Sequence, residues 1–406
     1  MPFEVVLWTR VVYMWLIKPR ICQTSVLTGI ISLLIFLTSP AQAQNQTQIQ
    51  WKTRPSVRSL DLKWQFKSAG RSLSQGRNQE SQISNEQIFE SKLNLDSHYW
   101  LSDELFFGFQ PSIRFQTGRI QTLDGANAPS NSVGLKKAAL QWLPSNYFWL
   151  SAGALNQGEI HSSLVADELP FPGARISAKT SFSNFDLLGL VESSIPSSNS
   201  LQTGTTQIEA VPMKNAAQIQ LNWQPKSYLF SKNRLGYFSY QNLPSEVAEA
   251  SSLMGNTTTR LSTEQWAFAY KYQGLEASSD WQLPLTTKID FLIQAAAAQN
   301  QSAPSAYNTG YSAYTGLRYL MNSRHDIQFG GRYFRVEPDT APSYYSNYGN
   351  FRTNRVGYSS EALWHLKKQK FSLAASYSEA QVIFEDPTQS RIRSFEIRLE
   401  TDYEAI

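Results

Sequence analysis

Apolar and polar side chains alternate from Leu105 to Thr117, and this pattern limits the folds open to the chain. The odd positions carry Leu105, Phe107, Phe109, Pro111, Ile113 and Phe115. The even positions after Phe106 carry Gly108, Gln110, Ser112, Arg114 and Gln116. Successive side chains of a strand point to opposite faces, so the stretch predicts a strand between an apolar and a polar environment. Pro111 cannot donate a ladder hydrogen bond, which predicts a local bulge there.

The same alternation recurs along the chain between turn signals. Short turns are expected at 144–146, 183–184, 225–227, 284–286, 322–324 and 367–369. Longer connections are expected at 158–173, 193–214, 242–260, 300–308, 337–354 and 385–390. We predict a loop at 68–85 and one long strand at 261–282, with aromatic residues Trp266, Phe268, Tyr270 and Tyr272 on one face. The pattern predicts about sixteen strands, within a range of roughly fourteen to eighteen.

The first 43 residues have the pattern of an export signal. Lys18 and Arg20 precede an apolar run over 26–37, and Ala41-Gln42-Ala43 provides a small-x-small cleavage site. The run is short for a membrane-spanning helix, although an N-terminal anchor is the alternative. The apolar segment before it suggests that translation starts at Met14 instead of Met1. Cleavage would remove three basic residues and one acidic residue, lowering the net charge from +4 to about +2.

Composition excludes several classes of protein. The chain's single cysteine, Cys22, lies in the signal, so the mature chain has no disulfide, thiol nucleophile or cysteine metal site. Beyond the signal there is no apolar run near twenty residues, which excludes a helical membrane protein. The charge balance gives no reason to expect nucleic-acid binding. A transmembrane β-barrel can be mildly hydrophilic and still contain 13% aromatic residues, because half of each strand faces water.

The distribution of turns and aromatic residues supports a membrane barrel. Short turns at one end and long loops at the other are typical of outer-membrane barrels. A soluble propeller is the alternative for a turn, strand, loop, strand recurrence, but the blade signatures are absent. Bulky aromatics flank five of the short turns, as expected of an interfacial girdle. These are Trp142, Tyr147, Trp223, Tyr228, Phe182, Phe185, Trp364, Phe371 and Tyr319.

With a C-terminal strand carrying Phe395, Ile397, Leu399 and Tyr403, the mature chain resembles a Gram-negative outer-membrane porin-type barrel. It departs from that pattern in ending on Glu404-Ala405-Ile406 instead of an aromatic residue. The resemblance implies an all-β fold, a transmembrane antiparallel β-barrel over 58–403, after a periplasmic leader over 44–57. It also implies contact with outer-membrane lipid and lipopolysaccharide, the barrel-assembly machinery and small hydrophilic solutes. It leaves the oligomeric state open, a homo-oligomer included.

No motif in the sequence predicts catalysis, a metal site or a cofactor. His98, His161, His325 and His365 lack zinc-ligand spacing, and we predict solvated or lumen-facing roles for them. Nucleophile-elbow and phosphate-loop motifs are absent from the sequence. Sequence spacing does not exclude a site assembled in space, so a barrel enzyme of the lipase or protease type remains an alternative.

The face opposite the aromatic residues carries many charges, which require a wet or extensively paired interior. A barrel of this size is too wide for side chains to fill, which predicts an aqueous or a plugged lumen. Arg318 and Arg332 would form a basic strip favouring anions, or would pair with Glu361 and its neighbours. The candidate pore-lining residues are Gln110, Arg114, Lys271, Asp290, Arg318, Arg332, Glu361 and Arg398.

The segment 158–175 is the candidate for a loop folded into the lumen. It combines acidic residues with an aromatic side chain and two prolines that restrict its backbone. The candidate constriction residues are Asp167, Glu168, Phe171 and Arg175. An ordinary surface loop would have the same composition.

The function that these patterns favour is a porin-like channel for passive diffusion of small hydrophilic solutes. A barrel enzyme, or a structural and adhesive barrel that displays its loops, are the alternatives. Bilayer conductance separates a channel from both.

Overall fold

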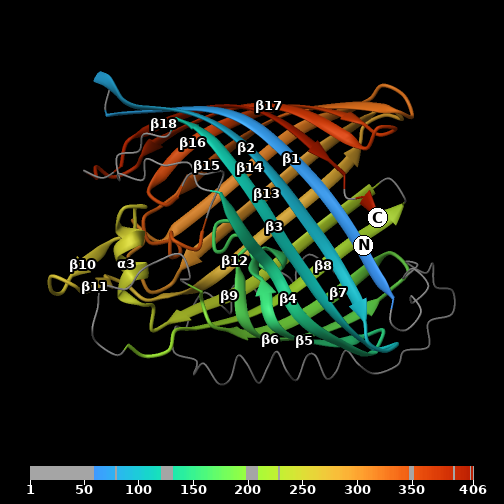
Figure 1. The fold of residues 1–406 in the computed structure, drawn as a ribbon, viewed down its shortest axis with the longest axis horizontal. Coiled ribbons are helices and arrows are strands. Elements are labelled where there is room, and N and C mark those ends of the chain that lie inside the picture. The colour runs from blue at the N-terminus through green and yellow to red at the C-terminus, as the bar shows by residue number, and fades with distance from the viewer. Residues whose placement is uncertain are drawn as a thin grey trace, which may run out of the picture. The chain divides into compact units, whose positions relative to one another are not determined.

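The computed structural model describes residues 59–77, 80–119, 131–197, 209–226, 229–346, 352–386, 389–402 and 404–405. The predicted signal over 1–43 and the leader over 44–57 lie outside these residues, as do Tyr228 and Tyr403. Within them, sixteen strands form one closed antiparallel β-barrel (Figure 1). β1 closes the barrel by pairing with both β2 and β18, and β9 pairs directly with β12. The predicted fold class is therefore confirmed.

The wall strands are β1 Leu60–Arg77, β2 Glu80–Trp100, β3 Leu105–Arg119, β4 Ser132–Ser145, β5 Phe148–Asn156, β6 Pro170–Ser181, β7 Phe185–Ser194, β8 Met213–Lys226, β9 Leu229–Gln241, β12 Tyr272–Pro284, β13 Ile289–Asn300, β14 Thr309–Leu320, β15 His325–Val336, β16 Arg355–Leu366, β17 Phe371–Val382 and β18 Arg391–Thr401. The short β19, Glu404–Ala405, pairs with β1. Outside the wall lie a 3₁₀ turn, η1 Gln157–Glu159, the helix α3 Ser245–Ser252, and the hairpin β10 Thr258–Arg260 with β11 Trp266–Phe268. No helix among the described residues is long and apolar enough to cross a membrane.

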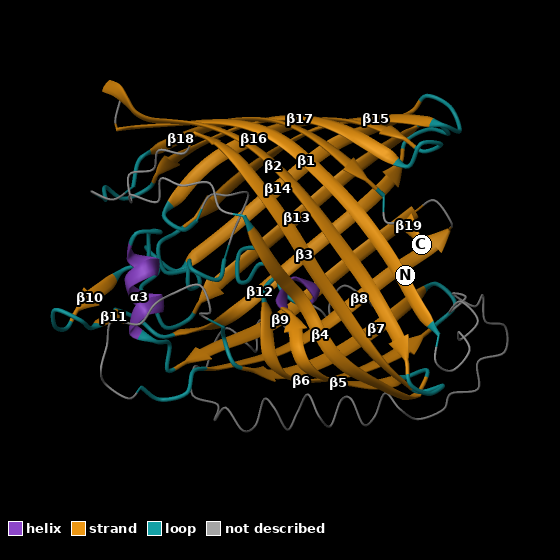
Figure 2. Ribbon diagram, viewed as in Figure 1, coloured by secondary structure: helices purple, strands orange, loops and turns teal. Residues whose placement is uncertain are grey.

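The two ends of the barrel differ as predicted. Short turns join β2 to β3, β4 to β5, β6 to β7, β8 to β9, β12 to β13, β14 to β15 and β16 to β17. Longer connections lie at the opposite end, where α3 and the β10–β11 hairpin gather (Figure 2). We call these the turn end and the loop end.

Two predicted segment boundaries are wrong. The segment 68–85 is not a loop, because Lys67–Gly76 pairs with Arg391–Glu400 of β18 as well as with β2. The segment 261–282 is not one strand. Its first part forms the tip and the second strand, β11, of the β10–β11 hairpin, and Tyr272 at the start of β12 is 1% exposed and donates a hydrogen bond to Asp339. Pairing with the distant strand β18 decided the first case, and the local β10–β11 hairpin decided the second.

The aromatic residues that alternate with polar ones in the sequence lie on the outer surface of the wall. Phe107, Phe109 and Phe115 are 39%, 39% and 59% exposed, and Trp142, Tyr147, Phe182, Tyr319 and Trp364 beside the short turns are also exposed. Phe106, which breaks the parity, is buried against Trp100, with ring centroids 4.7 Å apart. Apolar side chains exposed around a closed sheet are typical of a lipid-facing surface.

A β-bulge interrupts the pairing at Pro111, as predicted, but its extra residue lies on β4. Gln110 pairs with Lys137 and Pro111 with Leu135, so Lys136 is the extra residue. Lys136 binds Glu168 and Lys137 binds Glu159, both in the β5–β6 connection. The bulge therefore turns two consecutive lysines to the same, inner side of the wall.

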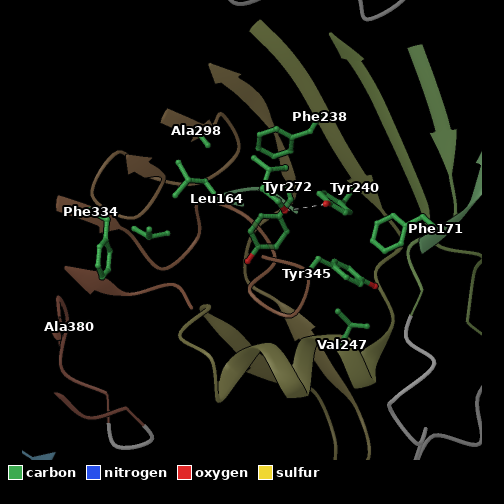
Figure 3. Packing of buried hydrophobic residues seen from close by; sticks show 12 residues of the cluster. Leu164, Phe171, Phe238, Tyr240, Val247, Tyr272, Ala298, Phe334, Tyr345 and Ala380 are labelled. Atoms are coloured by element: carbon green, nitrogen blue, oxygen red, sulfur yellow. Dashed lines mark hydrogen bonds between the residues drawn. The ribbon is translucent and has the colours of Figure 1, made fainter. Parts of the chain in front are cut away.

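Segments of three connections fill part of the barrel at the loop end. Leu164, Val165, Val247 and Tyr345 are fully buried against inward-facing Phe171, Phe238, Tyr240, Tyr272 and Phe334 (Figure 3). Tyr345 stacks on Tyr240 at 5.7 Å and meets Phe171 edge-on at 5.2 Å. Burying such side chains stabilises the fold by about 1.5–3 kcal/mol each, which offsets the entropy of ordering long connections.

Candidate functional site

Inward-facing ion pairs on one side of the wall remain in contact with solvent. Arg398 of β18 lies 3.3 Å from Glu361 of β16, and these side chains are 33% and 32% exposed. Lys67 of β1 lies 2.7 Å from Glu400, with exposures of 34% and 24%. Arg398 and Glu400 alternate along β18 with Ile397 and Leu399, which are exposed on the outer wall, so the two charged side chains face inward. Solvent therefore reaches the inner surface of β16, β18 and β1.

On the opposite side of the wall the inward charges are buried in a network. Lys214 of β8 and Glu192 of β7 are both 0% exposed and lie 3.3 Å apart. Glu192 also accepts from Arg175 of β6, and Arg175 continues to Glu159 of η1. Gln157, beside Glu159, is hydrogen-bonded to both Lys214 and Glu192. We call this set the ionic network, and it fixes the start of the β5–β6 connection to the wall.

His161 extends the contact of this connection to β12. Its Nδ1 is hydrogen-bonded to Glu276, whose other oxygen accepts from the amide and hydroxyl of Ser162 at 3.0 Å. Burial and the nearby Lys214 lower the pKa of His161, and Glu276 opposes this shift. His161 is thus neutral at pH 7. It is also only 4% exposed, so the predicted solvated or lumen-facing role is wrong for this histidine.

The tip of the same connection carries an acidic group among basic ones. Glu168 is 56% exposed at its side chain and binds Lys136. Burial alone would raise the pKa of Glu168, but Lys136, then Lys92 and Lys67, hold it below its usual value. Lys136 of β4 therefore binds Glu168 directly, and Lys92 of β2 and Lys67 of β1, which also binds Glu400, act on its charge from further away.

Most of the predicted pore-lining residues lie on inward faces. Gln110 donates to Asp96 at 2.9 Å, Asp290 accepts from Gln282 at 2.9 Å, and Arg114 of β3 pairs in register with Lys92. Arg318 binds Asp326 at 2.7 Å near the turn end. Arg332 donates to Gln294 and lies over the Tyr314 ring, with its guanidinium 5.3 Å from the ring centroid.

The predicted position of Lys271 is wrong. This residue precedes β12 and is exposed at the loop end, because Tyr272 and not Lys271 has the inward parity of the strand.

The predicted constriction residues divide between a connection and a strand. Asp167 and Glu168 lie in the connection, whereas Phe171 and Arg175 lie on the inner face of β6. The connection expected over 158–173 is shorter than predicted, because β6 already begins at Pro170. Pro170 and Pro172 pair with β5. On the side that faces β7, the pairing of β6 ends at Gly173 with Ser194, so neither proline lies opposite a paired residue of β7. A missing amide donor is tolerated at such a free edge.

Six residues of these contacts were not predicted as site residues from the sequence, namely Lys136, Lys137, His161, Glu192, Lys214 and Glu276. The consecutive lysines of β4 break the period of two, and that break could have indicated the bulge. Glu192, Lys214 and Glu276 have the inward parity of their strands. Their convergence on His161 and Glu159 required knowledge of where the connection folds.

The described residues contain no group of three or more His, Cys, Asp or Glu that could hold a metal ion. Ser162 and His161 both bind Glu276 and not each other, so they do not form a nucleophile–base pair.

Acid is expected to weaken the attachment of the connection. The lowered pKa of His161 means that below 6.5 the unfolded chain takes up a proton that the folded chain does not. The low pKa of Glu159, which Lys137 and Arg175 produce against the effect of burial, adds a loss as pH falls below 4.5. The free energy of unfolding, measured against pH, should therefore fall in two ranges. His161→Gln should remove the loss between 6.5 and 4.5; an unchanged profile in this variant would contradict the assignment.

No protein-family model matches the sequence, and no curated protein matches it. Among solved structures, the high-pH structure of *Pseudomonas putida* OprB is 12% identical with a TM-score of 0.53, over 85% of this chain and 94% of that one. *Salmonella typhi* OmpF in complex with daunomycin is 9% identical with a TM-score of 0.48, over 84% and 98%. Outer-membrane expressed OmpT of *Vibrio cholerae* is 9% identical with a TM-score of 0.47, over 87% and 99%.

At 12% identity the likeness to OprB concerns the fold alone. The sixteen closed strands, the exposed apolar wall and the different ends of the barrel agree with the architecture of outer-membrane barrels. This chain therefore has the fold of a porin-type outer-membrane β-barrel.

Proposed function

We propose that the protein is a passive channel for small hydrophilic solutes, with no catalytic step and no cofactor. The observation that carries the proposal is the partial exposure of inward ion pairs on β16, β18 and β1. Charges in a dry interior would need full pairing and burial, as in the ionic network on the opposite side. The path for solute therefore runs along β16, β18 and β1 to β4, beside the folded-in connection.

Liposome swelling tests solute passage. Vesicles that contain the refolded chain should swell in small neutral sugars, at rates that fall steeply as sugar size increases. Vesicles that swell no faster than protein-free vesicles would contradict the proposal.

The charge filter of this channel is the set of Lys67, Lys92 and Lys136 around Glu168, in place of the strip expected at Arg318 and Arg332. With Arg114 in register with Lys92, four positive groups lie near Glu168, Glu90 and the Glu400 that binds Lys67, so the net charge is slightly positive and favours anions modestly. The infolded connection carries Glu168 to this point, which makes it the constriction.

Reversal potentials in a salt gradient should show a modest anion preference. Lys92→Glu should shift the potential toward cation preference, since it changes the charge at the constriction by two units. Lys288→Glu, in the turn between β12 and β13, is the matched control and should leave the potential nearly unchanged. Cation preference in the unaltered channel would contradict the filter.

We also propose that residues 1–43 direct export and are removed, leaving a leader over 44–57. The Ala41-Gln42-Ala43 site supports this. N-terminal sequencing of the protein from isolated outer membranes should begin at Gln44. A first residue within 1–40 would contradict cleavage at this site.

A further inference from the structure

Two arginines interrupt the apolar outer wall at the loop end. Arg391 and Arg393 have the parity of Phe395, Ile397 and Leu399, which are exposed on the outer wall. Their own side chains are 34% and 51% exposed. Cationic side chains on a lipid-facing wall cost little near the headgroup level and much more at the bilayer centre. The pair therefore marks the headgroup level at the loop end of the barrel.

Outward tyrosines lie at the same level. In the register of the wall, Tyr333 pairs with Tyr358, Tyr358 with Glu379, and Glu379 with Arg393. Tyr333, Tyr358 and Tyr377 are 48%, 50% and 36% exposed. Tyrosine favours the interface between apolar chains and polar headgroups, which supports the assigned level.

Glu379 positions the two arginines. Its carboxylate accepts from Arg391 Nε at 2.7 Å and from the Tyr377 hydroxyl at 2.9 Å, and lies 3.4 Å from Arg393 Nε. The carboxylate is 7% exposed, so its surface is covered by these partners. One carboxylate against two guanidinium groups leaves a net positive charge.

Among the described residues, Arg393 has no polar partner for its two terminal amino groups. Within the described residues its only recorded polar partner is Glu379, through Nε. Beyond Nε, a guanidinium carries two terminal amino groups in a planar fork, and the Arg393 side chain is 51% exposed, so this fork suits a phosphate. The neighbouring strand leaves room, because Arg393 pairs with Ser74 and Arg391 with Gly76.

We propose that Arg391 and Arg393 form a binding site for the phosphate of a lipid in the outer leaflet. Long loops of outer-membrane barrels face the exterior, so the loop-end headgroup layer is the outer leaflet. The acyl chains of the bound lipid lie against Phe395 and Ile397, and the tyrosines flank its headgroup. A free phosphate would gain the charge contact but not the apolar one.

The test compares the full mature chain with the Arg391→Gln/Arg393→Gln variant, both refolded in neutral detergent. Diphosphorylated lipid A, its dephosphorylated form and inorganic phosphate are the probes, and binding is measured by native mass spectrometry and titration. We expect at least about tenfold weaker binding of the phosphorylated lipid to the variant, which corresponds to about 1.4 kcal/mol. The dephosphorylated lipid should bind both proteins equally.

Arg335→Gln is the matched control, because Arg335 is also outward at this end but binds Glu337 at 3.3 Å. It should change lipid binding little, and single-channel conductance should be the same in both variants. Equal binding of the phosphorylated lipid to all three proteins would overturn the proposal. Equally tight binding of inorganic phosphate would overturn the role of the lipid. Loss of a self-associated form in the double variant alone would identify a second copy of the chain as the occupant instead.

Discussion

Replacing Glu192 with glutamine is expected to lower the free energy of unfolding by about 3–5 kcal/mol, because it leaves buried cations without their carboxylate. Lys214 is 0% exposed and Arg175 is 7% exposed, so water cannot take the place of Glu192. Glutamine also keeps only one acceptor oxygen, so either Arg175 or the donors Gln157 and Lys214 would face an NH2 group. Urea unfolding of the refolded barrel in lipid vesicles, followed by tryptophan fluorescence, measures the change.

Glu361→Gln is the matched control for this prediction. Glu361 also binds an arginine inside the barrel, but it is 32% exposed, so its loss should cost no more than about 1 kcal/mol. Lys214→Met in the Glu192→Gln background should recover part of the loss, since it removes one uncompensated cation. Equal effects of Glu192→Gln and Glu361→Gln would show that the ionic network does not hold the connection to the wall.

Replacing Ser162–Glu168 with a short Gly-Ser linker is expected to raise single-channel conductance roughly twofold, because it removes the segment that we propose as the constriction. The replacement removes Leu164 and Val165 from the buried cluster and Glu168 from the lysines of the filter. It keeps Gln157 and Glu159, so the attachment to Lys214 and Arg175 remains. Planar bilayer recordings at fixed salt measure the conductance.

A control replacement at the loop end separates constriction from general loosening of the fold. Residues 261–264 at the tip of the β10–β11 hairpin are exposed, and the same linker there should leave conductance unchanged. Retention of the folded barrel by both variants is checked by the change in gel mobility on heating. Unchanged conductance after removal of Ser162–Glu168 would exclude this segment as the constriction.

The sequence predicted the wall of this barrel well because the period of two is a local property. Phe107, Phe109 and Phe115 lie on the outer surface, and Gln110 faces inward, as alternation required. Turn residues such as Pro144, Asn322 and Lys367 marked the turn end for the same reason. The hairpin over 68–85 was missed because its pairing with β18 connects residues more than 300 positions apart in the chain.

The interior was predicted only in outline, because it depends on where the connections fold. Parity placed Asp290, Arg318 and Glu361 on the inner face, and one of the two alternatives offered Glu361 as a partner of Arg318. Arg318 binds Asp326, whereas Glu361 binds Arg398, and neither pair follows from sequence spacing. The ionic network joins β6, β7 and β8 through η1, so its residues could not be grouped until the position of that turn was known.

Single-channel conductance of the refolded mature chain tests the central claim most directly. An aqueous path along β16, β18 and β1 to β4 predicts discrete current steps in a planar bilayer, proportional to voltage at low potentials. The steps should retain their size in Arg391→Gln/Arg393→Gln, which alters only the outer wall. A correctly folded barrel that inserts into the bilayer without passing current would contradict a water-filled channel.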